Sequence, residues 1–168
     1  MVGIQDLQKI HVLRELPEDM LDKIGSIATL HLYSADTALF KQHERLEYFY
    51  MVLSGSVRLE LVASKDITIT LGVVQPGYTF GISTFIPNSK SGSTAICAEP
   101  CELIRLSGPK MTQLFEQEPE LGYQFMLRVV RVFRSVLGHR TTMFIKTLAK
   151  HPEMESLFDD LKHLAPIF

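Results

Sequence analysis

The chain has 168 residues, of which 46% are hydrophobic and 21% are charged, and this composition indicates a folded globular domain rather than a disordered segment. Its formal net charge of −2 excludes a global electrostatic attraction to nucleic acid or to anionic membranes. Two cysteines are too few for a disulfide-built fold, and no apolar run approaches the roughly 20 residues that span a bilayer. The first residues also lack the apolar core of a signal peptide, so we expect a cytoplasmic protein.

The first predicted element is a helix over residues 16–30. Pro17 suits the first helical turn, and Glu18 and Asp19 suit the positive end of a helix. The apolar residues that follow share one helical face: Met20, Leu21, Ile24, Ile27 and Ala28. We therefore expect residues 1–31 to form an N-terminal helical segment.

From Leu32 onward the apolar period changes to two, which indicates β-strands. Residues 48–53 form a β-rich run, residues 57–61 alternate apolar and charged side chains, and residues 67–71 form a returning strand. Further strands are predicted at 73–75, 95–98 and 102–106. Many short strands separated by glycine and proline, without strand–helix alternation, predict an all-β roll or sandwich over residues 32–108.

After Gly108 the pattern returns to helix. A short helix is predicted at 110–118 and a long one from Glu120 to about residue 150, so residues 109–150 form a C-terminal helical region. The long helix has an apolar side formed by Phe125, Val129, Val132, Val136 and Leu137. The tail at 151–168 has helically spaced apolar residues and is predicted to form one more short helix. The fold class is therefore mainly β with flanking helices.

Three stretches within the predicted roll carry a resemblance to a known family. They are residues 39–44 (Leu-Phe-Lys-Gln-His-Glu), 50–57 (Tyr-Met-Val-Leu-Ser-Gly-Ser-Val) and 76–81 (Pro-Gly-Tyr-Thr-Phe-Gly). Their order and spacing resemble the cyclic nucleotide-binding domain family, in the arrangement of the catabolite-activator and Fnr-like sensor domains. The resemblance covers residues 13–137 and implies a double-stranded β-helix, or jelly roll, with an N-terminal helix and a long C-terminal helix at a dimer seam.

The same resemblance implies where a ligand would bind. In the family, a short helix after the position of Gly81 offers backbone amides to a phosphate, as helix N-termini do for anions. A glutamate next to this glycine binds the ribose, and an arginine about eleven residues on pairs with the phosphate charge. Here these two positions are occupied by Ile82 and Gly92, so both charged contacts are missing. His43 and Tyr78 replace a glycine and an aspartate of the family pattern.

The segment from Gly81 to Thr94 corresponds to the phosphate-binding cassette of the family, and its remaining residues could still hold an anion. Small hydroxyl side chains and a glycine permit a backbone nest, and Lys90 supplies a positive charge. Each missing charge-assisted bond costs about 1.5–3 kcal/mol, so we expect the usual nucleotide to bind weakly. The candidate ligand is a cyclic nucleotide or another small anion. The candidate site consists of Gly81, Ile82, Ser83, Thr84, Lys90, Gly92, Ser93 and Thr94.

Three functions are compatible with these residues. The first is a regulatory domain that senses a small ligand and repositions the long helix. The second is a scaffold for a partner protein that has lost ligand binding, an alternative favoured by Ile82 and Gly92. The third is a haem or metal sensor, which rests only on six scattered histidines and two cysteines. Cys97 and Cys101 lack a zinc-binding spacing and are interpreted as small buried hydrophobic residues.

The sequence contains no nucleophile elbow and no Walker loop, so we do not expect an enzyme. We expect a homodimer through residues 120–139, where apolar ridges suit helix–helix packing. Arg128, Arg131 and Arg134 are interpreted as the solvated face of that helix. Direct DNA binding is not expected, because no helix-turn-helix pattern follows the long helix.

Overall fold

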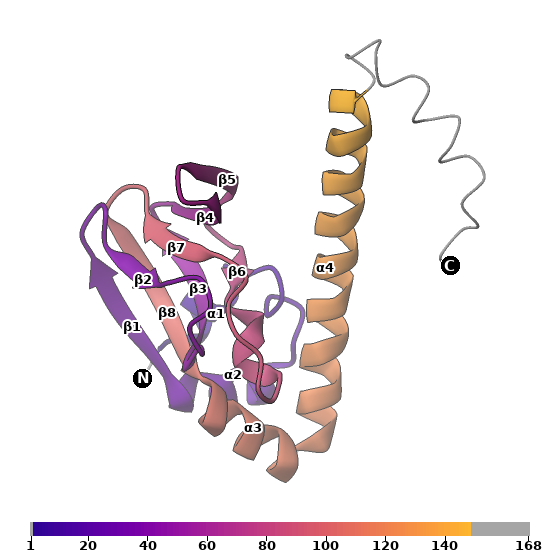
Figure 1. Cartoon of the computed structure of the whole chain (residues 1–168). Helices are drawn as coiled ribbons and strands as arrows, with labels where there is room; N and C mark the ends of the chain where they lie inside the picture. Colours follow the sequence, from indigo (N-terminus) through magenta and orange to yellow (C-terminus); the bar gives the residue numbers. More distant parts are fainter. Residues whose placement is uncertain (1, 149–168) are drawn as a thin grey trace, which may run out of the picture. The chain divides into compact units, whose positions relative to one another are not determined.

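The computed structural model describes residues 2–148, and the chain divides into two compact units, residues 1–128 and 129–168. The described strands all belong to the first unit (Figure 1). The helices are α1 (Ile4–Leu7), α2 (Glu18–Ile27), the 3-10 helix η1 (Ile82–Phe85), α3 (Gly108–Gln117) and α4 (Pro119–Leu148). The strands are β1 (Ala28–Tyr33), β2 (Ala38–Phe40), β3 (Tyr48–Ser54), β4 (Val57–Ser64), β5 (Ile67–Val74), β6 (Thr79–Phe80), β7 (Thr94–Cys97) and β8 (Cys101–Ser107).

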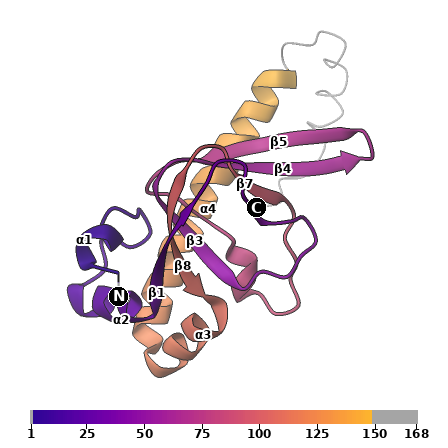
Figure 2. The same ribbon diagram turned by 90° about the vertical axis from the view of Figure 1, so that its left-hand side faces the viewer.

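The strands form two four-stranded antiparallel sheets, with the orders β1-β8-β3-β6 and β2-β7-β4-β5. Neighbours within a sheet are mostly distant in sequence, so the chain passes repeatedly from one sheet to the other (Figures 1 and 2). Two facing sheets connected in this way make a jelly roll. The predicted fold class, mainly β with an N-terminal helix and a long C-terminal helix, is confirmed.

Strand β3 is the centre of the first unit because it is buried on both faces. Phe49 packs against Phe85 and Phe125 with ring centroids 5.2 and 5.9 Å away, and Met51 is buried as well. The other face of β3 joins the core between the two sheets. That core consists of Phe40, Tyr50, Val52, Val57, Phe80, Ala95, Cys97, Cys101 and Leu103.

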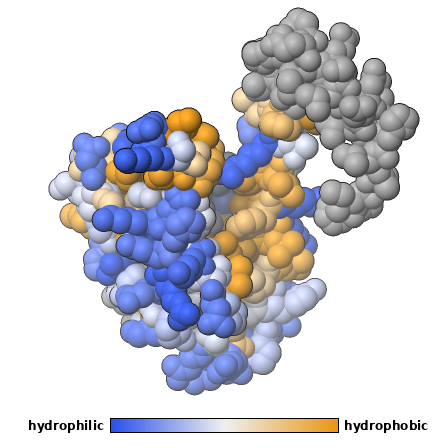
Figure 3. Space-filling model, viewed as in Figure 1, coloured by the Kyte–Doolittle hydropathy of each residue, from blue (hydrophilic) through white to orange (hydrophobic). Residues whose placement is uncertain are grey.

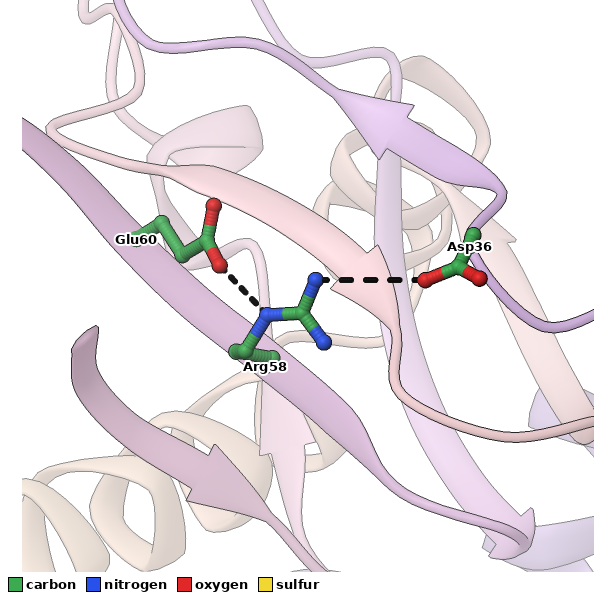
Figure 4. Close-up of polar contacts among 3 residues, drawn as sticks. All are labelled: Asp36, Arg58 and Glu60. Atoms are coloured by element: carbon green, nitrogen blue, oxygen red, sulfur yellow. Dashed lines mark hydrogen bonds and ion pairs between the residues drawn. The ribbon is translucent and has the colours of Figure 1, made fainter. Parts of the chain in front are cut away.

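A polar contact on β4 ties the second sheet to the turn between β1 and β2. The Arg58 guanidinium donates to the Glu60 carboxylate, and its Nη2 lies 4.0 Å from Oδ1 of Asp36 (Figure 4). The backbone N–H of Asp36 also donates to the carbonyl of Cys97 in β7 at 2.8 Å. Both carboxylates therefore lie near one guanidinium.

Helix α2 is shorter than the sequence predicts, because it ends at Ile27 and the first strand begins at Ala28 rather than at Leu32. The six residues of β1 pair in register with β8, from Ala28 opposite Leu106 to Tyr33 opposite Cys101. Leu30, the last residue of the predicted helix, is 44% exposed. Pairing with a distant strand therefore overrides the local helical pattern. The helix predicted at 151–168 lies outside the described residues.

The apolar side predicted for the long helix is only partly available to a partner. Phe125 and Val129 are buried, with 0% and 4% of their surface exposed, so the prediction that they form part of a dimer seam is wrong. A different set of large apolar side chains is exposed along α4, and Figure 3 shows apolar colour along much of this helix. It includes Tyr123, Met126, Val130 and Phe133, and also Val136 and Leu137 from the predicted apolar side.

The three arginines predicted to form the solvated face of α4 differ in exposure. Arg131 and Arg134 are exposed, as expected for a solvated face. Arg128 is half-buried and donates to the backbone carbonyls of Gln124 and Glu15, both at 3.0 Å. Among residues 2–148, none of the helices is long and apolar enough to cross a membrane.

Candidate functional site

Gly81 lies between β6 and η1 in a conformation that other residues adopt at a cost. Its φ is +86°, in the left-handed region, and a Cβ atom here would lie 2.9 Å from the backbone carbonyl oxygen of Tyr48. The same Cβ would lie 3.3 Å from Tyr50 and 3.6 Å from Leu46. Glycine is therefore needed both for the turn and for the close approach to β3. This fixes the start of the candidate cassette against the central strand.

The single turn of η1 follows Gly81. Its first residue, Ile82, stands where the resemblance places a glutamate, and it is half-buried. The backbone N–H of Thr84 donates to the carbonyl of Gly81 at 3.2 Å. The Thr84 hydroxyl is buried without a hydrogen-bond partner and lies against Gly108, where a Cβ would be 2.2 Å from it. Thr84 therefore faces the start of α3, while Ser83 stays partly accessible.

The second half of the cassette is fixed by Ser91, which is 4% exposed. Its backbone N–H donates to the carbonyl of Glu44 and its carbonyl accepts from the N–H of His43, both at 2.8 Å. The Ser91 hydroxyl accepts from the N–H of Ser93 at 3.2 Å. His43 itself is exposed at φ +67°, which explains why the family pattern has glycine at this position.

Gly92 and Lys90 flank this buried serine on the exposed side of the loop. A Cβ atom at Gly92 would meet nothing within 4 Å, and the residue has no positive φ. Lys90 is exposed. The Thr94 hydroxyl, by contrast, accepts a hydrogen bond from the N–H of Gln42 at 3.1 Å. The candidate residues thus form two groups, one at Gly81 to Thr84 and one at Lys90 to Thr94, both held by the turn that precedes β3.

The cassette carries little charge of its own. Between Gly81 and Thr94 the only ionisable side chain is Lys90. A second cation reaches the loop from outside, because Nη2 of Arg45 lies 3.4 Å from Oδ1 of Asn88. Arg45 was missed by the sequence analysis, since nothing local in the 41–48 turn indicates that it meets a loop more than forty residues later. Tyr78, which replaces an aspartate of the family pattern, packs edge-on against the ring of His11, with ring centroids 4.4 Å apart.

The histidines and cysteines of the sequence were the basis for a metal or haem sensor. No group of three histidine, cysteine, aspartate or glutamate side chains suitable for a metal occurs within residues 2–148. Cys97 and Cys101 are both free and buried, which confirms their interpretation as small core residues. Burial and the neighbouring Cys101 thiol raise the pKa of Cys97 to about 12. Such a thiol stays protonated and is a poor nucleophile or ligand at neutral pH.

Comparison with known proteins identifies one family. The model of the cyclic nucleotide-binding domain matches residues 30–118, which is more than half of the chain. None of the curated proteins searched matches this sequence. Many solved structures share the fold, at low sequence identity.

Three of these structures illustrate the similarity. A Geobacter metallireducens protein described as a cyclic nucleotide-binding protein is 22% identical, with a TM-score of 0.72, and the match covers 82% of this chain and 99% of that one. The catabolite activator protein of Thermus thermophilus is 22% identical, with a TM-score of 0.65, and the match covers 82% of this chain and 64% of that one. The regulatory domain of Toxoplasma gondii PKA, solved with cAMP, is 21% identical, with a TM-score of 0.58, and the match covers 66% of this chain and 42% of that one. The chain therefore spans less than two thirds of the length of the latter two.

Proposed function

This chain belongs to the cyclic nucleotide-binding domain family, and from that premise we propose that it is a regulatory ligand-sensing domain whose altered cassette binds cyclic AMP and cyclic GMP only weakly. The family consists of binding and sensor domains, which agrees with a role in regulation rather than catalysis. The proposed location is the cytoplasm.

The observation that carries the proposal is the pair of uncharged residues at the two contact positions. Ile82 begins η1 without a carboxylate for the ribose, and Gly92 leaves open space where a guanidinium would meet the phosphate. The scaffold around them is complete, because Gly81 has the required turn and Ser91 fixes the loop by two backbone hydrogen bonds. These observations support a cassette that keeps its backbone and lacks the two charged contacts.

The cations near this cassette point to a small anion as the ligand. Lys90 is exposed on the loop, and Arg45 reaches the same loop at Asn88. Neither replaces the arginine position directly, and exposed cations contribute little to binding because water screens them. A ligand held by these groups would therefore bind with modest affinity.

The proposed unit is a homodimer formed through α4. Five of the exposed apolar residues of this helix recur at alternating spacings of three and four: Tyr123, Met126, Val130, Phe133 and Leu137. This is the a/d spacing of a two-stranded coiled coil. A second copy of the helix is the occupant that such a self-complementary stripe suits.

Thermal unfolding with added nucleotide tests the ligand proposal. A ligand at 100 times its Kd stabilises a protein by about 2.7 kcal/mol. For a chain of this length, that raises the melting temperature by roughly 5–10 °C. We expect cyclic AMP or cyclic GMP at micromolar concentration to raise it by less than about 1 °C. A rise of several degrees would contradict the proposal, and its loss in Lys90→Gln or Arg45→Gln would identify the cation responsible.

A further inference from the structure

A second polar feature lies away from the cassette, on the first sheet, where β1, β8 and β3 lie side by side (Figure 1). Arg105 is in the middle of β8, opposite Tyr50 of β3 and Thr29 of β1. It interrupts an otherwise buried apolar series, because Leu103, Ile104 and Leu106 are 0% exposed. An arginine in the middle of such a strand needs partners for its charge.

The guanidinium of Arg105 has only neutral partners. Its Nη1 donates to the Tyr33 hydroxyl at 3.0 Å, and its Nη2 lies 2.6 Å from Nε2 of His31. Its central carbon lies 4.4 Å from the centroid of the Tyr48 ring. Its Nε is buried and has no hydrogen-bond partner. The side chain is thus held by Tyr33, His31 and the Tyr48 ring, while its buried Nε–H has no partner.

None of the ion pairs formed within residues 2–148 includes Arg105. Burial and the adjacent guanidinium lower the pKa of His31, so the imidazole is neutral and can accept the hydrogen bond from Nη2. A partly buried cation with neutral neighbours is the arrangement that an external anion would complete.

The guanidinium lines a cavity that can admit such an anion. The cavity has a volume of about 320 Å³, at the lower end of the roughly 300–1,000 Å³ found for ligand pockets. Polar atoms form most of the surface that faces the cavity, and its lining also includes the aromatic and aliphatic residues Tyr33, Leu39, Phe40, Leu46, Tyr48 and Tyr50. The aromatic rings among these residues suit a ligand that itself has an aromatic ring, since aromatic groups pack well on one another.

The charges around the cavity limit what kind of anion fits. Glu44, Arg45 and Glu47 also line it, so two carboxylates face any ligand beside the two guanidinium groups. A multiply charged phosphate would be repelled by both glutamates, whereas a single carboxylate can pair with Arg105 as a planar fork. A ligand with one negative charge is therefore favoured over a nucleotide phosphate.

We propose that this cavity binds a small aromatic monocarboxylate, with the carboxylate on the Arg105 guanidinium and the ring between Tyr33 and Tyr48. The site is separate from the cassette, although Leu46, Tyr48 and Tyr50 also surround Gly81. None of the cassette residues from Gly81 to Thr94 lines the cavity, so the benzoate titration and the nucleotide melts test the two proposals separately.

The test is a titration of the full chain with sodium benzoate, observed by NMR at the arginine Nε–H groups. We expect one saturable shift, at the Nε of Arg105, and no such shift with neutral benzamide or with inorganic phosphate. Arg105→Gln should weaken benzoate binding by about ten- to a hundredfold, the loss of a charge-assisted bond. Arg131→Gln, at an exposed position on α4, should leave the affinity unchanged.

A second variant separates binding from folding. Tyr33→Phe keeps the ring and removes the hydroxyl that orients the guanidinium, so it should weaken benzoate several-fold without lowering the melting temperature by more than a few degrees. The proposal is overturned if no saturable shift occurs at millimolar benzoate, if Arg105→Gln binds benzoate as tightly as the unchanged chain, or if phosphate binds at the same place with equal affinity.

Discussion

Replacement of Gly81 by alanine tests whether the turn at the cassette is fixed as the structure describes. A non-glycine residue in the left-handed region costs about 1–2 kcal/mol. The new Cβ would lie 2.9 Å from the carbonyl oxygen of Tyr48, and because that atom is backbone, β3 or β6 must shift. Overpacking of this kind costs about 1–3 kcal/mol. Loss of glycine's freedom in the unfolded chain returns at most about 1 kcal/mol.

We therefore expect Gly81→Ala to lower the free energy of unfolding by about 1–4 kcal/mol. Gly92→Ala is the matched control, because a Cβ there meets nothing within 4 Å and the residue has no positive φ. It should leave stability unchanged or raise it by up to about 1 kcal/mol. Urea unfolding followed by circular dichroism measures both, since the chain has no tryptophan. Equal stability of the two variants would refute the reasoning.

Two further predictions concern assembly and pH. Light scattering should give a particle mass of twice the 19.0 kDa chain at micromolar concentration. Phe133→Asp should halve that mass because it places a charge on the exposed apolar stripe of α4, whereas Ser135→Asp, at an exposed position outside the stripe, should not. A monomeric unchanged chain would contradict the dimer. Burial raises the pKa of Tyr50 from 10.0 to about 12, and that of Cys97 from 9.0 to about 12. Because the unfolded chain then releases these protons first, stability should fall as pH rises from about 9 to 12, and less steeply in Tyr50→Phe. Thermal melts between pH 8 and 11 that show no decline would count against this burial.

The roll could be predicted from the sequence because its strands are marked by local signals. Alternation in residues 57–61 and the glycine at position 81 both correspond to features of the structure, β4 and the turn before η1. The boundary at Ala28 could not be predicted, because β1 is defined by its pairing with β8, about seventy-five residues later. Leu30 fits a helical spacing as well as it fits a strand.

The functional faces were harder to predict because they depend on contacts between distant residues. Helix α4 is apolar on more than one side, and only the packing of Phe125 on Phe49 and Phe115 shows which side is internal. The same holds for Arg105 in β8, because its partners His31 and Tyr33 lie in β1, more than seventy residues earlier in the chain. An arginine within an apolar strand was the one local signal for that site.

The central claim is that the cassette backbone is intact and only its two charged contacts are missing. The most direct test is a calorimetric titration of cyclic AMP into the double variant Ile82→Glu with Gly92→Arg. The open space at Gly92 can accommodate the longer side chain, and each restored contact is worth about 1.5–3 kcal/mol. We predict that the double variant binds at least about tenfold more tightly than the unchanged chain, and more tightly than either single variant. A double variant that melts like the unchanged chain but shows no heat of binding would contradict the claim.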